Sequence, residues 1–180
     1  MGRFGRGTAH RARGCGREGV SVSVSIPPPV AADLIHERVK AVLGDRVIAA
    51  NSLRNYLTIE IAATDLLVVA TALRDDPELR FNFFGDVTAV HWPGESQELE
   101  VVYHLRSIPA NRRIRVKTRI AAHESVESMA QVWPGADWPE REVYDLMGVN
   151  FVNHPDLRRI LMDEDYEYHP LRKDFPREGL

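Results

Sequence analysis

The residues with the most obvious chemical potential are clustered acids near the end of the chain. Glu140 and Glu142 form one acidic pair, and residues 163–165 form an uninterrupted acidic run. Paired carboxylates can act in general acid–base catalysis when their environments separate their pKa values. In a segment this rich in charge, neighbouring acids are usually solvated or paired with arginine. We therefore predict no catalytic residue among them.

Two histidines, His154 and His169, could ligate a metal ion if Asp156 or Asp163 lay near them. Each histidine precedes a proline, which favours extended backbone at the histidine. No cysteine and no helical two-histidine spacing accompanies the pair, so a metal site is not the favoured interpretation. We expect each histidine instead to form a hydrogen bond that fixes a turn or reaches the backbone of a partner.

The chain has a single cysteine, Cys15. A disulfide framework is therefore excluded, and so is an iron–sulfur cluster held by the chain's own thiolates, which requires about four of them. No serine lies in the context of a nucleophile elbow. We expect this chain to bind no metal and no cofactor itself.

Length and composition indicate one ordinary globular domain. The chain has 180 residues, of which 44% are hydrophobic and 27% charged, enough to bury a substantial core. No apolar run approaches the roughly 20 residues that a membrane helix needs, so we expect membrane association only through partners. The net charge of −3 gives no reason to expect nucleic acid or an anionic membrane as a global partner.

The chain divides into three regions. Residues 1–29 are an Arg/Gly-rich leader followed by VSVSVSIPPP, and we expect a disordered leader with a Pro-rich lead-in. Residues 30–132 form the expected α+β domain, with a mixed or antiparallel sheet and two helices packed on one face. Residues 133–180 form a charged and aromatic segment that continues into an extended C-terminal arm.

Hydrophobic periodicity locates the elements of the α+β domain. It predicts, in chain order, a helix over 30–43, a strand over 56–62, a helix over 65–74 and a strand over 79–92. Thr64 is a plausible N-cap of the second helix. Gly85 marks a bend or bulge in the strand. Ser125 is a candidate cap of a short later helix.

A hairpin is predicted where SIPAN separates ELEVVYHLR from RRIRVKTRI. Its apolar faces coincide in one register, which places Leu105 opposite Ile114, Tyr103 opposite Val116, Val101 opposite Thr118 and Leu99 opposite Ile120. A shift by one residue would expose the apolar side chains of one strand.

The other face of the hairpin's second strand is basic. It carries Arg113, Arg115, Lys117 and Arg119, with His104 and Glu100 on the facing strand. Three interpretations stay open: a solvated face, an electrostatic surface for an acidic partner, and a nucleic-acid surface. The last is disfavoured because no aromatic side chain interleaves with the basic ones.

The segment 133–176 combines aromatic anchors with arginines, the residue types that dominate interface hot spots. Pro139 suits the first turn of a helix that runs to about Met147, where Gly148 ends it. On this helix Asp145 lies four residues after Arg141, so the two could form an ion pair. After Val149, repeated prolines exclude a long helix, and we expect an arm that extends over another protein.

Three blocks in this segment, EREVYDLMGVNF, HPDLRRILM and HPLRKDFP, closely resemble the signature of the C subunit of the proton-pumping NADH:quinone oxidoreductase, the 30 kDa subunit family of respiratory complex I. The resemblance is densest over 133–176. It extends more loosely through YHLRSIPANRRIRVKTRI to about residue 30.

The resemblance implies a cofactor-free peripheral-arm subunit on the cytoplasmic side of the cell inner membrane. The complex passes electrons from NADH through FMN and Fe-S centres to quinone and pumps protons. The arm is expected to contact two neighbours, the large D subunit and the Fe-S-carrying B subunit. The expected partner-binding residues are Glu140, Arg141, Glu142, Asp145, His154, Arg158, Arg159, His169, Arg172 and Lys173.

Several alternatives remain. Arg158 and Arg159 could instead pair within the chain with Asp156 or Asp163, and Arg172 could pair with Asp174 or Glu167; contacts with another subunit are favoured by the resemblance. The chain could also be the equivalent subunit of a membrane-bound NiFe hydrogenase or of a quinone oxidoreductase with another electron donor. From a different class, it could be a free-standing adaptor or a nucleic-acid-binding module.

Overall fold

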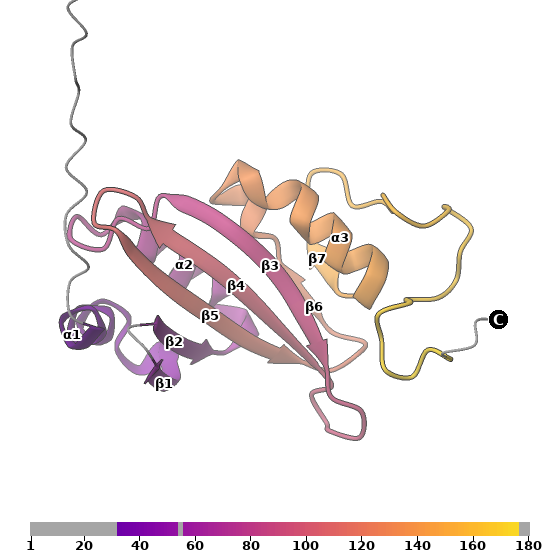
Figure 1. The fold of residues 1–180 in the computed structure, drawn as a ribbon, viewed down its shortest axis with the longest axis horizontal. Helices are drawn as coiled ribbons and strands as arrows, with labels where there is room; N and C mark the ends of the chain where they lie inside the picture. The colour runs from indigo at the N-terminus through magenta and orange to yellow at the C-terminus, as the bar shows by residue number, and fades with distance from the viewer. Residues whose placement is uncertain (1–31, 54–55, 177–180) are drawn as a thin grey trace, which may run out of the picture.

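A five-stranded mixed sheet organises the structure, a computed structural model that describes residues 32–53 and 56–176 (Figure 1). Its strands lie in the order β1-β2-β5-β4-β3. Neighbouring strands are antiparallel except for β2 and β5, which are parallel. The strands are β1 (Val47–Leu53), β2 (Tyr56–Ile61), β3 (Phe83–His91), β4 (Leu99–Ser107) and β5 (Arg112–Ile120).

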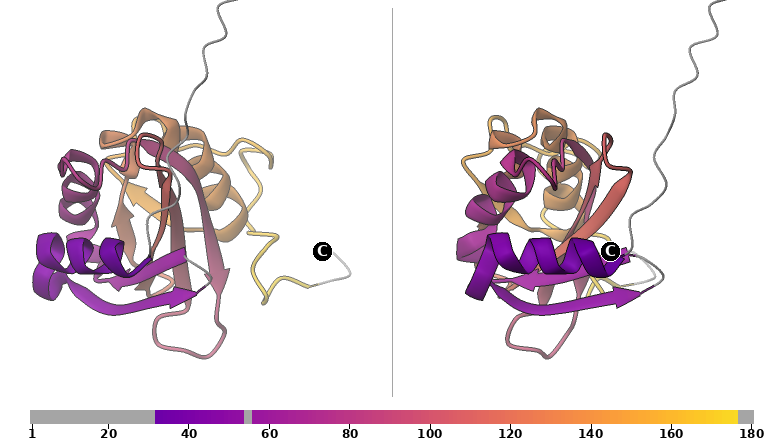
Figure 2. Two further views of the ribbon diagram at one scale, coloured as in Figure 1. Left: turned by 60° about the vertical axis from the view of Figure 1, so that its left-hand side comes forward. Right: turned by 90° about the vertical axis from the view of Figure 1, so that its left-hand side faces the viewer.

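The helices of the described residues pack beside this sheet, as two further views show (Figure 2). They are α1 (Ala32–Leu43), α2 (Leu66–Asp75) and α3 (Asp137–Met147). Short 3-10 turns cover Gly44–Arg46, Ala63–Asp65, Met129–Gln131 and Pro134–Ala136. A second, two-stranded sheet pairs β6 (Ser125–Glu127) in parallel with β7 (Asn150–Val152).

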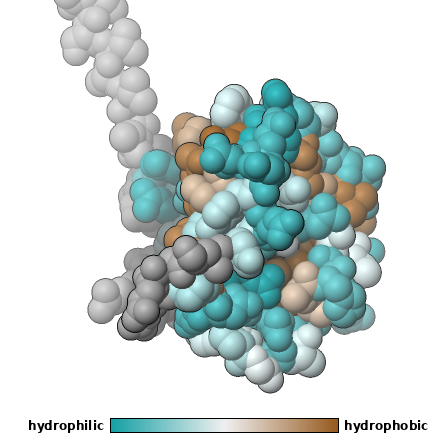
Figure 3. Space-filling model, turned by 90° about the vertical axis from the view of Figure 1, so that its right-hand side faces the viewer, coloured by the Kyte–Doolittle hydropathy of each residue, from teal (hydrophilic) through white to brown (hydrophobic). Residues whose placement is uncertain are grey.

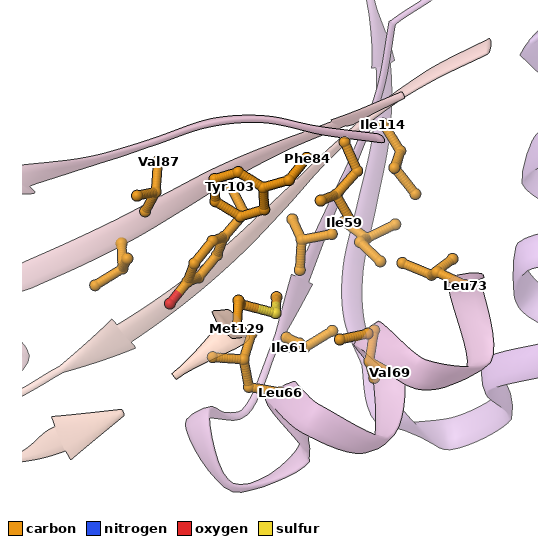
Figure 4. Close-up of a cluster of buried hydrophobic side chains, with 14 of the residues drawn as sticks. Ile59, Ile61, Leu66, Val69, Leu73, Phe84, Val87, Tyr103, Ile114 and Met129 are labelled. Atoms are coloured by element: carbon orange, nitrogen blue, oxygen red, sulfur yellow. The ribbon is translucent and has the colours of Figure 1, made fainter. Parts of the chain in front are cut away.

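One face of the large sheet is buried under the helices. Ile59, Val116 and Tyr103 lie side by side across β2, β5 and β4 and are fully buried. Figure 4 shows this layer meeting residues of α2 such as Val69. The same core includes Val143 of α3, so the core continues across the expected division between residues 132 and 133. The α+β prediction, with helices 30–43 and 65–74 on one face, is confirmed, and α3 is a further helix of that layer.

The hairpin prediction is confirmed residue by residue. Leu105 faces Ile114, Tyr103 faces Val116, Val101 faces Thr118 and Leu99 faces Ile120. The expected irregularity at Gly85 is also present, because the β3–β4 register shifts between Phe84 and Asp86. A Cβ at position 85 would lie 2.8 Å from the carbonyl oxygen of His104, so the bulge leaves no room for a side chain there,.

Three local predictions are wrong. Thr64 is not the N-cap, because the chain enters α2 through the 3-10 turn Ala63–Asp65. Strand β3 starts at Phe83 rather than at 79, because Arg80 adopts a left-handed conformation with φ of 47°. Ser125 opens β6, and it is Ser128 whose hydroxyl accepts from the Ala130 N–H and caps a 3-10 turn.

The opposite face of the large sheet carries no helix among the described residues, and we call it the open face. Its β5 residues are Arg113, Arg115, Lys117 and Arg119. Long side chains cover much of it, since Val102 and Glu100 beneath them are buried,. The predictions for residues 1–29 lie outside the described residues. Within the described ranges, no helix has the length and apolar character required to span a membrane.

Candidate docking site

The expected arm is present as residues 153–176, which form no helix or strand in the described chain and are drawn in yellow beside α3 (Figure 1). A segment without a hydrogen-bonded ladder must find other partners for its backbone groups. The arm finds many of them on α3 and at the end of β3. The position of the arm is therefore set by a few side chains.

Asp145 is the principal anchor of the arm. Its side chain is fully buried near the end of α3. One carboxylate oxygen accepts three successive backbone N–H groups of the arm, from Ile160 at 3.1 Å, Leu161 at 2.7 Å and Met162 at 2.9 Å. The other oxygen accepts from Arg159 Nη1 at 2.5 Å. Burial raises the pKa of Asp145, but these bonds outweigh it and hold the pKa below its ordinary value,.

A second anchor lies at the C-terminal end of α3. The Nδ1 atom of His169 donates to the backbone carbonyl of Asp145 at 2.9 Å. The imidazole also lies against Gly148, which ends the helix with φ of 75°. A Cβ at Gly148 would lie 2.6 Å from His169 Cδ2. Glycine is therefore required here both for the left-handed backbone and for the close approach of the arm.

A third anchor joins the start of the arm to the start of α3. The His154 side chain is fully buried; Nε2 donates to the Asp137 carbonyl at 3.0 Å, and Nδ1 accepts from the Asp156 N–H at 3.0 Å. Arg141 is also buried and donates to the Arg158 carbonyl at 3.2 Å. His154 thus forms a turn-fixing hydrogen bond of the kind that the sequence predicted, whereas the His169 side chain bonds to the backbone of α3 in the same chain.

Glu140 ties α3 to the 3-10 turn that follows β6. The carboxylate is fully buried and accepts from the Ser128 hydroxyl at 2.5 Å and from the Met129 N–H at 2.7 Å. Burial raises its pKa, and the charge of Asp137 adds to the rise, while the two hydrogen bonds oppose it. The balance places the pKa of Glu140 at about 7.

The end of the arm returns to the large sheet. The Lys173 N–H donates to Nδ1 of the buried His91, the last residue of β3, at 3.1 Å. Arg172 lies 3.8 Å from Glu98 and 3.3 Å from Asp174. The Lys173 ammonium lies 5.6 Å from the centre of the Trp92 ring. The arm therefore bridges α3 and the β3–β4 connection.

Large apolar side chains remain exposed on α3 and the arm. Trp138 is 65% exposed, Leu161 57% and Leu171 60%, and the view toward the arm shows hydrophobic areas within a largely hydrophilic surface (Figure 3). The Leu161 N–H donates to the Asp145 carboxylate, and the Leu171 N–H donates to the Leu146 carbonyl. Both leucines therefore lie beside the end of α3, in the arrangement of a docking surface.

Sequence comparison assigns the chain to a family. The family described as respiratory-chain NADH dehydrogenase, 30 Kd subunit, matches residues 59–179. This chain belongs to that family. A relative from Rhodopseudomonas palustris (strain TIE-1), named as the C subunit of NADH-quinone oxidoreductase, is 49% identical over 124 residues, which are 69% of this chain and 61% of the relative. The chain thus spans about three fifths of the length of that relative.

A second relative agrees with the family, and a solved structure agrees with the fold. A protein of the same name from Roseiflexus sp. (strain RS-1) is 45% identical over 141 residues, or 78% of this chain and 81% of the relative. A chain in the structure of the membrane-bound sulfane sulfur reductase (MBS), an archaeal respiratory membrane complex, superposes with a TM-score of 0.69 at 24% identity. That match covers 81% of this chain and 85% of the other, and it supports the fold.

The structure places the ten predicted partner-binding residues of this family member on α3 and the arm, but most of them bond within the chain. Only Glu142, Arg158 and Lys173 are exposed. Asp145 pairs with Arg159 rather than with Arg141 on its own helix. Pairing within the chain is observed for the other arginines too, with Arg158 on Asp156 and Arg172 on Asp174. Their contacts with another subunit stay a prediction.

Sequence reasoning missed Leu161 and Leu171 as candidate docking residues. Leu161 lies in the short apolar run Ile160–Met162 and Leu171 lies between Pro170 and Arg172, in a segment without helical or strand periodicity. The available signal was an apolar side chain in a segment that cannot bury it by regular packing.

Replacing Asp145 with asparagine should free the arm. An amide cannot balance the Arg159 charge, so we expect a loss of roughly 3 kcal/mol in the free energy of unfolding and faster trypsin cleavage after Arg158 and Arg159. Chemical denaturation and timed proteolysis measure the two effects. Asp163→Asn makes the same change at an exposed arm residue and should behave as the wild type; equal effects in both variants would contradict the anchor.

Glu140 should make stability depend on pH. Because its folded pKa of about 7 exceeds the unfolded value, the folded chain binds the proton more tightly, and stability falls as pH rises through this range. We expect Glu140→Gln to remove a decline of roughly 1–3 kcal/mol between about pH 5 and 8, measured by denaturation at each pH. The exposed Glu142→Gln should keep the decline. An unaltered decline in Glu140→Gln would refute the assignment.

Gly148→Ala should disturb the structure more than the strain of an alanine in left-handed backbone does by itself. Gly44→Ala is the matched control, because Gly44 has φ of +57° and a Cβ at this position would have nothing within 4 Å. Both variants should lose about 1–2 kcal/mol for the backbone. Only Gly148→Ala should also displace His169 and increase amide hydrogen exchange in the arm. Identical exchange in the two variants would show that the contact with His169 is unimportant.

Proposed function

We propose that this chain is a cofactor-free subunit of the peripheral arm of a proton-translocating NADH:quinone oxidoreductase, and that its role is architectural. Membership of the 30 Kd subunit family and relatives named as the C subunit of NADH-quinone oxidoreductase support the proposal. In this role the chain binds neighbouring subunits that carry the FMN, Fe-S and quinone chemistry. It lies on the cytoplasmic side of the inner membrane and is held there through those neighbours.

The proposal rests on the contrast between the charged residues that hold the arm in place and the apolar residues that it exposes. The ion pair between the buried Asp145 and the partly buried Arg159 fixes its path, while Leu161 and Leu171 stay exposed. A segment that is already ordered loses little conformational entropy on binding. The arm therefore suits the permanent attachment of large neighbours, for which the large D subunit and the Fe-S-carrying B subunit are the proposed partners.

Rigid attachment is also the function that electron transfer requires of a subunit without cofactors. Transfer between redox centres depends on the distances between them, and those distances are set by how the subunits that hold the centres pack together. A chain that fixes two neighbours against each other contributes to turnover without contacting a substrate.

The test is assembly of the complex. Leu161→Asp and Leu171→Asp should each reduce the assembled complex on native gels and the recovery of companion chains in pull-downs, while the melting temperature of the purified chain stays unchanged. Both side chains are already exposed, which is why folding is spared. Ile48→Asp is the matched control, since Ile48 is 66% exposed on edge strand β1, and it should assemble normally.

Two results would reject the proposal. One is full assembly with both leucine variants. The other is a set of co-purified chains, identified by mass spectrometry, that includes hydrogenase subunits and no NADH-binding subunit.

A further inference from the structure

The open face of the sheet has charge that is balanced at one end. There, Glu100 accepts from Lys117 at 2.5 Å and lies 3.2 Å from Arg119. Arg119 also pairs with Glu95 at 2.6 Å. The cations at this end of β5 are therefore neutralised within the chain.

At the other end three arginines outnumber the acid beside them, Asp86 of β3, which lies opposite His104. Arg106 of β4 and Arg113 of β5 lie directly opposite each other, and Arg115 follows on the same face. Within residues 32–53 and 56–176, none of these three forms an ion pair with an acid. The Nε atom of Arg106 is buried without a hydrogen-bond partner. Like charges opposite each other in a ladder cost free energy, so the fold maintains an unfavourable arrangement here.

A hollow of about 230 Å³ adjoins these arginines. Its wall includes Phe83, which is 50% exposed, and the bulge at Gly85, where a side chain would collide with the backbone of His104. Burial and the nearby Arg115 lower the pKa of His104 by more than the charge of Asp86 raises it, so its imidazole adds a neutral polar wall. The hollow can thus accommodate an apolar side chain, and arginines surround it.

We propose that this end of the open face binds an acidic segment of a second protein. Carboxylates of that segment bond to Arg106, Arg113 and Arg115, and a neighbouring apolar side chain occupies the hollow beside Phe83. A guanidinium can bind a carboxylate through two parallel hydrogen bonds. A carboxylate placed between Arg106 and Arg113 also offsets the repulsion between them. The arrangement that is unfavourable in the free chain therefore favours binding.

Nucleic acid fits this surface less well. Stacking of bases requires free aromatic faces, but Arg115 lies 5.0 Å from the centre of the Tyr56 ring and covers it. Among the described residues that line the hollow, Phe83 is then the phenyl or phenol ring left uncovered, and the His104 ring is bonded to the Tyr56 hydroxyl. The hollow lies at Phe83, the first residue of β3, whereas the arm attaches at His91, the last residue of that strand. This inference therefore goes beyond the proposed docking role of the arm and uses none of its residues.

Photo-crosslinking of the full chain in its native complex tests the inference. The photoreactive residue p-benzoylphenylalanine replaces Phe83, and mass spectrometry identifies the crosslinked segment. We expect a protein segment with several Asp or Glu residues adjacent to the crosslink. Combining this substitution with Arg113→Glu should lower the yield at least about tenfold at about 150 mM salt.

Two controls separate binding from folding. Lys40→Glu makes the same charge change at an exposed residue of α1 and should leave the yield unchanged. Arg113→Glu should not lower the melting temperature of the purified chain, because the new carboxylate faces Arg106. The inference is overturned by the absence of a crosslink, by a crosslink to RNA or to a segment without acids, or by a yield that Arg113→Glu does not change. Native gels of the same Arg113→Glu sample show separately whether the complex has assembled.

Discussion

The arrangement of the C-terminal half depends on one buried carboxylate. An irregular segment such as the arm has no ladder to satisfy its backbone N–H groups, and burying them unpaired would cost free energy at each one. A single carboxylate oxygen of Asp145 accepts the backbone N–H groups of three consecutive arm residues. Its other oxygen is neutralised by Arg159, so the charge itself is tolerated in the interior. The arm is ordered because α3 presents this group at its end.

This arrangement reverses the usual expectation for a charged segment. Residues such as Glu140, Arg141 and Asp145 are directed inward and are almost completely buried, whereas leucines and a tryptophan face outward. Charged groups specify geometry well because their hydrogen bonds are directional, and apolar groups supply contact area without directional demands. The buried charged groups hold the surface in one geometry, and the exposed apolar groups make the contact. Such a surface can attach to a partner with little rearrangement.

The features that the sequence predicted correctly are those with a local period or a local steric demand. The register of the β4–β5 hairpin follows from alternation, and Gly85 and Gly148 mark places where a side chain does not fit. The link from Asp145 to Arg159 could not be foreseen, because the arm between them has no repeating geometry that fixes which residues meet. The same limit hid β1, whose sequence VIAANSL lacks clear alternation, and the three-residue strands β6 and β7.

The parallel pairing of β2 with β5 determines the order in which the protein can be completed during synthesis. Leu57 pairs with Ile114, so the β1–β2 hairpin leaves the ribosome well before the strand that covers its inner edge. Until β5 emerges, that edge presents free backbone groups to other nascent chains. The β4–β5 hairpin, formed by neighbouring residues, closes the sheet in one step when it arrives. The inner edge of the β1–β2 pair is therefore the part of the sheet that waits longest for its partner during synthesis.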